Sequence, residues 1–336
     1  VRMVGNQAEG YVAAGGAVAN EFGGSLTIHR SELSGNAVTG DVIAVGGGIT
    51  SDIGPTLNED GSPGNGTGKP SVHVSYSSFA ENEVRALVSD PSQAVPFEPF
   101  AGFALGGALS SFAGDTIVSH SRFEDNRVFG GDGGNGSTGG FSAGGAIFTD
   151  DFSPFDFEGP IFGRDSSLDV SISSFVGNTS SGGAGSDGAT GGFATGGAIT
   201  ASIAFFDETA SIRHSQFKYN TAVGGVGGEG GMGGKALGGA VAALAGADVY
   251  IAKSKFSHNE AIGGDGGVGG QGGDGVGGAI GAGRLITAVD TDLEFLIPSL
   301  NVRHTMLDGN EAWGGTGGVG ASGGDGNGGA IGVTEG

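Results

Sequence analysis

Apolar and polar residues alternate in short segments that recur along the whole chain. In one such segment Leu26 and Ile28 lie ten and eight positions before Asn36, and Ser31 and Leu33 lie five and three positions before it. Each half alternates with period two, which is typical of a β-strand with one buried face. The inward-facing positions are even-numbered before Asn36 in the first half and odd-numbered in the second, a shift of one residue. We therefore expect a corner between two strands.

Two tetrapeptides punctuate these segments in alternation, GG(A/G)(V/I/L) and (F/L)xxN. The Asn of the second motif recurs at Asn36, Asn82, Asn126, Asn178, Asn220, Asn259 and Asn310. Its aromatic position is Phe79, Phe123, Phe175, Phe217 and Phe256. Stacked coils spaced ~4.8 Å apart would align these residues into Asn and Phe ladders. We therefore predict an all-β fold, a right-handed parallel β-helix of about eight coils that forms one domain over residues 1–336.

The glycine-rich segments keep a constant length. Five of the repeated Asn residues are followed eighteen residues later by the next GGA, and Gly occupies positions 4, 7, 10 and 13 after each of them. The position after each of these glycines is usually Gly as well. The remaining position of each triplet accepts any residue, and we call the row of these unrestricted positions the free ridge. A polyproline-II-type helix has three residues per turn and no internal hydrogen bonds. We therefore predict polyglycine-II-like inserts that bond to the coils above and below.

These inserts divide the domain into two parts. Residues 1–125 should form plain coils with variable inserts, and residues 126–336 should form coils that carry the fixed-length glycine segments. At about 3.1 Å per residue, a 12-residue run would extend roughly 37 Å as one broad wall. The glycine segments would thus add a layer to the C-terminal two-thirds.

Composition excludes several classes of function. Among 336 residues there is no Cys, so disulfides and thiolate metal sites are impossible. No run of 18 apolar residues occurs, so no membrane span is predicted. A formal net charge of −22 makes a nucleic-acid partner unexpected. Only Gly182–Thr190 fits a calcium-binding nonapeptide, which needs tandem copies, so no cofactor is predicted and loosely bound calcium stays open.

The alternation of GGA(I/L/V) with FxxN resembles the passenger domains of the chlamydial polymorphic outer-membrane proteins. Eight copies of the first motif and seven of the second cover essentially the whole chain. The resemblance implies a bacterial protein that is exported to the cell surface, with an adhesive or structural role. Neither end of the repeat has the polar cap of most solenoids, so we expect end-to-end association or a segment of a longer fibre.

Two other functions remain open. Parallel β-helices often cleave acidic polysaccharides, and such sites need convergent carboxylates. Six residues after the first Gly of the GGA motif, only Glu21, Asp52 and Asp150 are acidic, so no catalytic residue is assigned and the chain is not expected to be an enzyme. A polysaccharide lyase or hydrolase is the alternative. Ice binding by the glycine layer is a further alternative, although the free ridge has mixed and charged residues.

Basic residues gather just before the repeated Asn residues. The nine positions that precede each Asn hold all six His and eight of the 14 Lys and Arg. The residues expected to form a contact stripe are Arg30, His120, Arg213, His214, Lys253, Arg303 and His304. Such a stripe could bind another copy, another surface protein or an anionic glycan, with salt-sensitive strength and more tightly once histidines are protonated. The alternative is that strand exteriors simply tolerate long polar side chains.

An aromatic insert follows one GGA strand. It carries Phe152, Phe155 and Phe157 among acidic residues. It could fold back over the strands of the solenoid, or it could form an exposed contact for a neighbouring protomer.

Overall fold

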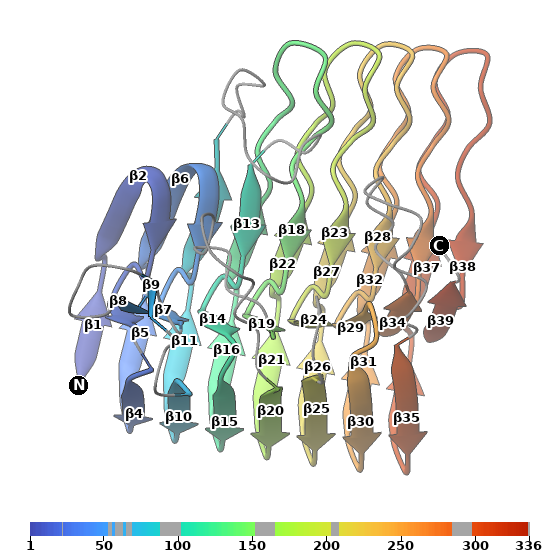
Figure 1. The fold of residues 1–336 in the computed structure, drawn as a ribbon. Helices are drawn as coiled ribbons and strands as arrows, with labels where there is room; N and C mark the ends of the chain where they lie inside the picture. Colours follow the sequence, from blue (N-terminus) through green and yellow to red (C-terminus); the bar gives the residue numbers. More distant parts are fainter. Residues whose placement is uncertain are drawn as a thin grey trace.

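The computed structural model describes residues 1–21, 23–52, 69–87, 102–151, 165–202, 208–283 and 298–334, and the backbone of two short strands at 56–57 and 63–64. The described residues form parallel β-sheets and no helix, and successive coils stack side by side from the N-terminus to the C-terminus (Figure 1). This confirms the predicted all-β parallel β-helix. The chain has no described helix that is long and apolar enough to cross a membrane.

Two sheets contain the strands on either side of the predicted corner. Sheet 1 comprises β1 (Arg2–Val4), β5 (Glu32–Ser34), β11 (Ser78–Ala80), β16 (Arg122–Glu124), β21 (Ser174–Val176), β26 (Gln216–Lys218), β31 (Lys255–Ser257) and β36 (Met306–Asp308). Sheet 2 comprises β4 (Ser25–His29), β10 (Ser71–Ser75), β15 (Asp115–Ser119), β20 (Ser166–Ser171), β25 (Glu208–Arg213), β30 (Asp248–Ala252) and β35 (Ser299–Arg303). Equivalent residues of successive coils pair in parallel without a slip, as Phe79 pairs with Phe123 and Phe123 with Phe175.

Two further sheets complete each coil. Sheet 3 comprises β2 (Gln7–Ala14), β6 (Ala37–Val45), β12 (Glu83–Ala86), β13 (Phe103–Leu105), β17 (Arg127–Phe129), β18 (Ser142–Ala143), β22 (Thr179–Ser181), β23 (Ala194–Thr195), β27 (Thr221–Val223), β28 (Ala236–Leu237), β32 (Glu260–Ile262), β33 (Gly275–Val276), β37 (Glu311–Trp313) and β38 (Gly326–Asn327). Sheet 4, which begins within the GGA motif, comprises β3 (Val18–Asn20), β7 (Ile49–Ser51), β14 (Leu109–Phe112), β19 (Ile147–Asp150), β24 (Ile199–Ser202), β29 (Val241–Leu244), β34 (Ile280–Gly283) and β39 (Ile331–Thr334). Outside these sheets, β8 (Thr56–Leu57) pairs antiparallel with β9 (Pro63–Gly64).

Stacked aromatic rings form the centre of the core. The rings of Phe79, Phe123, Phe175, Phe217 and Phe256 are fully buried. Successive ring centroids are 4.5–4.9 Å apart and successive planes differ by only 2–8°. Aromatic burial and stacking both favour this arrangement, and it requires every coil to keep the same register.

The repeated Asn residues form a second ladder beside the rings. Asn126, for example, donates from its backbone N to Asn178 Oδ1 at 3.1 Å and from Nδ2 to the same oxygen at 2.9 Å. Its Nδ2 also donates to the carbonyl oxygen of Phe79 at 3.0 Å. The six Asn residues from Asn36 to Asn259 are completely buried. The bonds of each Asn connect three successive coils. They also give hydrogen-bond partners to backbone polar groups that the buried turn would otherwise leave unpaired.

A Ser ladder turns the corner between sheets 1 and 2. The backbone N of Ser121 donates to Ser173 Oγ at 3.2 Å, and Ser121 Oγ donates to the carbonyl oxygen of Ser119 at 2.7 Å. The equivalent pair of bonds recurs from Ser31 to Ser254. The Ser at this position is therefore structural.

Each glycine segment forms a hairpin that projects from sheet 3 (Figure 1). The chain reverses at the tenth residue after the Asn, where Gly136, Gly188, Gly230, Gly269 and Gly320 have φ between 78° and 89°. The expectation of a single 12-residue wall is therefore wrong. Both arms keep the three-residue repeat but run in opposite directions, because left-handed glycine at the tip permits a tight reversal.

Hydrogen bonds explain the three-residue phase. Every third amide bonds to the next coil, as the amides of Gly182 and Gly185 donate to the carbonyls of Val223 and Val226. The amides one position later bond across the two arms; the amide of Gly183 donates to the carbonyl of Gly140 in the preceding coil. The third position points outward and carries the varied side chains. Two of every three positions are thus restricted to small residues by neighbouring backbone.

A valine at a packed position should disorder the hairpins while a valine on the free ridge should not. A Cβ on Gly183 would lie 1.9 Å from the carbonyl oxygen of Gly131, a backbone atom that cannot move aside. We expect Gly183→Val to lower the free energy of unfolding by about 1–3 kcal/mol. Hydrogen exchange should show faster exchange in both arms.

The matched control is Ala184→Val, one residue further on. Ala184 lies on the free ridge, where the next coil already carries Val226. Equal exchange rates in the two variants would contradict the packing described here.

Candidate functional site

The most distinctive surface of the solenoid is its edge between sheets 2 and 1. The corner residue lies six positions before each Asn and has a positive φ of 45–52° in every described coil. We call these residues the corner row: Arg30, Tyr76, His120, Ile172, His214, Lys253 and His304. This backbone conformation is uncommon for residues other than Gly, and it directs all seven side chains outward at the same sharp turn. All seven side chains are exposed.

Two further rows flank the corner row. The residue before the corner is His29, Ser75, Ser119, Ser171, Arg213, Ala252 or Arg303. The residue two positions after it is Glu32, Ser78, Arg122, Ser174, Gln216, Lys255 or Met306. We call the three rows together the basic edge.

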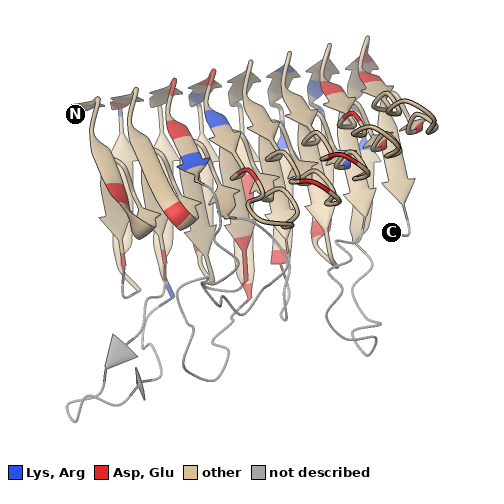
Figure 2. Cartoon of the chain, turned by 90° about the horizontal axis from the view of Figure 1, so that it is seen from above, with Lys and Arg blue, Asp and Glu red and all other residues tan. Residues whose placement is uncertain are grey.

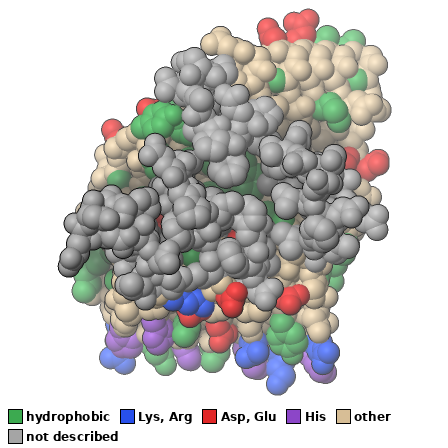
Figure 3. Space-filling view, in the orientation of Figure 1, with side chains coloured by type: hydrophobic (Ala, Val, Ile, Leu, Met, Phe, Trp, Pro, Cys, Tyr) green, Lys and Arg blue, Asp and Glu red, His purple; other side chains and the backbone are tan. Residues whose placement is uncertain are grey.

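The basic edge has the opposite charge to the rest of the chain. Its three rows of seven described positions contain six Lys or Arg, four His and one acid, Glu32. The formal charge of the edge is therefore +5 with neutral His, on a chain of net charge −22. Blue and purple side chains gather along the lower edge in Figure 3, and acidic residues lie on the glycine hairpins in Figure 2.

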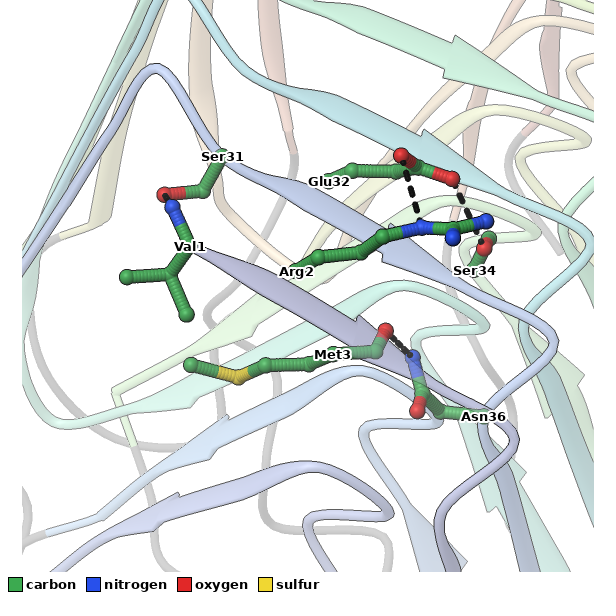
Figure 4. A network of polar contacts seen from close by, with 7 residues as sticks. All are labelled: Val1, Arg2, Met3, Ser31, Glu32, Ser34 and Asn36. Atoms are coloured by element: carbon green, nitrogen blue, oxygen red, sulfur yellow. Dashed lines mark hydrogen bonds and ion pairs between the residues drawn. The ribbon is translucent and has the colours of Figure 1, made fainter.

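The single acid of the edge is already paired. Arg2 Nε lies 3.1 Å from Glu32 Oε2, and Ser34 Oγ donates to Glu32 Oε1 at 3.3 Å (Figure 4). Arg122 likewise forms an ion pair of 2.6 Å with Glu124 of the same strand. Among the described residues, no ion pair engages Arg30, Arg213 or Lys253. These cations are free to meet an anionic partner.

Aromatic contacts hold part of the edge in place. Tyr76 stacks on His120 with centroids 4.6 Å apart, and the ring of His29 meets Tyr76 edge-on at 5.7 Å. Further along, the guanidinium of Arg213 lies 5.5 Å from the ring centre of Tyr250. Such contacts fix the orientation of side chains that remain exposed.

A shallow groove of about 840 Å³ runs along the edge. It is lined on one side by the corner row from Arg30 to His214 and on the other by Ser78, Arg122 and Ser174. Six coils contribute to it, from β1 to β26, so its long direction follows the solenoid axis.

The structure brings all seven residues of the expected contact stripe onto this edge. Five lie in the corner row, and Arg213 and Arg303 lie in the row before it. Tyr76 and Ile172 share the corner and were missed, because the stripe was selected by charge. Counting six positions back from every Asn finds both. The Asn and Phe ladder residues, in contrast, are inside the solenoid and have no surface to offer a ligand, except at its ends.

Phe152, Phe155 and Phe157 of the aromatic insert lie outside the described residues. The described part of the chain contains no group of three or more His, Cys, Asp or Glu that could hold a metal ion.

One buried carboxyl was not found from the sequence. Glu208 begins β25 and is 1% exposed; the hydroxyl of Thr149 donates to its Oε1, and its Oε2 has no hydrogen-bond partner among the described residues. The pKa of Glu208 is raised to about 8, mainly by burial; the Thr149 hydrogen bond opposes the rise and the negative charge of Asp151 adds to it. The sparse acidic row six residues after the first Gly of the GGA motif is interrupted at Asp150, which pairs with Phe112 and Ser202 in adjacent coils.

A scan of protein-family models and searches of curated proteins and of solved structures found no match to this chain.

Proposed function

We propose that the chain is a non-enzymatic structural and adhesive β-solenoid of a bacterial surface protein, which acts outside the cell. The observation that carries this proposal is the unbroken series of Asn, Ser and Phe ladders through the stacked coils. A solenoid with such ladders is a stiff rod, and the resemblance of its repeats to surface passenger domains supports an exported role. The free cations of the basic edge supply a surface for adhesion.

We infer that the glycine hairpins form a polyglycine-II-type layer that widens the rod. The three-residue hydrogen-bond repeat between coils and the small-residue restriction at two of three positions support this. Such a layer adds backbone hydrogen bonds without needing an apolar core. It therefore suits a rod that must be broad as well as stiff.

We further propose that the rods continue beyond one chain, by end-to-end association or as part of a longer fibre. Each ladder has the same polarity at every step, because the Asn of one coil always donates to the Asn of the next. An additional coil of the same kind would extend it. Electron microscopy of purified protein at increasing concentration should show filaments or rods that lengthen; rods of constant length would contradict association.

A polysaccharide-active enzyme is the competing function, and the buried carboxyl of Glu208 beside Asp151 is the observation that favours it. A carboxyl with a raised pKa can act as a general acid. We expect no shortening of acidic polysaccharides, measured with and without calcium by size-exclusion chromatography. Shortening that disappears in Glu208→Gln would overturn the non-enzymatic role.

A further inference from the structure

We propose that the basic edge binds a linear acidic polysaccharide, laid in the groove along the solenoid axis. The inference rests on the proposed adhesive function and names the chemical class of its partner. Carboxylate-bearing and sulfate-bearing chains share the required chemistry, which is a flexible string of anionic sugar rings.

The charge distribution selects an anionic partner. Six Lys or Arg and one acid lie on the edge, whereas the whole chain has 14 Lys or Arg and 36 acids. Random placement would give an acidic edge, as elsewhere on the molecule. Arg30 and Lys253 have no described acidic partner, so an incoming anion would not have to displace an internal ion pair. Such a surface attracts an anion.

The shape of the groove selects a single chain. Short Ser78 and Ser174 side chains alternate with the longer Arg122 and Gln216 along one side, with the corner row on the other. A polymer chain that follows the axis would meet one outward residue of the corner row per coil, about every 4.8 Å.

Exposed apolar side chains within the row select sugars among the polyanions. Tyr76 and Ile172 are 54% and 53% exposed; Tyr76 lies between Arg30 and His120, and Ile172 lies between His120 and His214. His120 and His29 hold the Tyr76 ring in place, which lowers the entropy lost when a ligand stacks on it. A sugar ring has an apolar face that suits such a side chain.

The test measures binding of the purified chain to polygalacturonate, to heparin and to duplex DNA, with neutral dextran as reference, by isothermal titration calorimetry. The variant is Arg30→Asn/His120→Asn/His214→Asn, since Asn tolerates the positive φ of the corner and should preserve the fold. We expect both anionic polysaccharides to bind, dextran not to bind, and the triple variant to bind at least tenfold more weakly. Added salt should weaken the wild-type interaction. The control is Lys235→Asn on a glycine hairpin, which removes one cation away from the edge and should bind as the wild type does.

Three results would overturn the inference. They are failure of the wild type to bind either polymer, equal binding by the triple variant, and equal affinity for duplex DNA. Absence of polymer binding together with self-association that the triple variant loses would instead assign the edge to a second copy. The proposed function fails differently, by shortening of the polymer during the titration; a tenfold loss in the triple variant would still support the binding site.

Discussion

Replacement of Asn178 by Ala is expected to lower the free energy of unfolding by about 3–5 kcal/mol, because the change breaks the ladder in the middle of the solenoid. Asn178 Oδ1 accepts from the backbone N and the Nδ2 of Asn126, at 3.1 and 2.9 Å. Its Nδ2 donates to Asn220 Oδ1 at 2.9 Å and to the carbonyl oxygen of Phe123 at 3.1 Å. Chemical denaturation, followed by far-ultraviolet circular dichroism, measures the loss.

The size of this effect follows from what the substitution leaves behind. Asn178 is completely buried, so no water can replace the lost side chain. The backbone N of Asn126 and the carbonyl oxygen of Phe123 would each lose a partner inside the protein, and each unsatisfied buried group costs about 1–3 kcal/mol. The stacked coils on either side hold the site open, so relaxation cannot restore the bonds.

Asn310→Ala is the matched control at the other end of the same ladder. Asn310 accepts from Asn259 and donates to the carbonyl oxygen of Phe256, but it is only half-buried. Water can hydrate the groups that this substitution exposes, so we expect a loss of about 1 kcal/mol. Equal losses in the two variants would mean that the ladder does not contribute through buried hydrogen bonds.

The periodic parts of the fold could be predicted because they depend on local repetition. The phase shift between Ile28 and Leu33 predicts the corner, and the structure places Arg30 there with a φ of 45°. The recurring (F/L)xxN motif predicts stacking, since a Phe or Asn can be buried in every coil only if the coils share one register. These inferences need only the chain's own period.

The glycine hairpins show where repetition misleads. A constant length correctly indicates ordered segments, but glycine occupies both the packed positions and the tip, so composition hides the reversal. The tips do have a signal, because Asn135 and Asp187 each precede a glycine of positive φ, and Asn-Gly and Asp-Gly are typical turn pairs. The reversal could have been predicted from these two coils.

The groove and the buried carboxyl depend on contacts between coils that no local pattern encodes. Tyr76 and Ile172 become part of one surface with Arg30 only through stacking. Glu208 lies 59 residues from Thr149 in the sequence, yet the two side chains share a hydrogen bond. Neither the spacing nor the residue types distinguish this Glu from the acids on the surface.

Replacement of Glu208 by Gln should stabilise the protein by about 4 kcal/mol at pH 7.5 and leave its stability unchanged at pH 4. The pKa of the buried carboxyl is raised to about 8 from an ordinary value of 4.5. Below pH 4.5 the carboxyl is protonated in both the folded and the unfolded chain, so ionisation makes no difference. Between these values only the unfolded chain releases the proton, and each further pH unit favours unfolding until the folded carboxyl also ionises near pH 8.

Gln keeps the shape of the protonated acid and can still accept the hydrogen bond from Thr149, but it cannot ionise. The difference in free energy of unfolding between the two proteins therefore isolates this carboxyl from the many acids that titrate in both. Denaturation curves at half-unit intervals from pH 4 to pH 8.5 should diverge steadily above pH 4.5 and run parallel above pH 8. Glu229→Gln, on an exposed hairpin tip, should run parallel to the wild type throughout. A constant offset between wild type and Glu208→Gln across the whole range would show that Glu208 is ionised in the folded protein, and would remove the main reason to consider it a general acid.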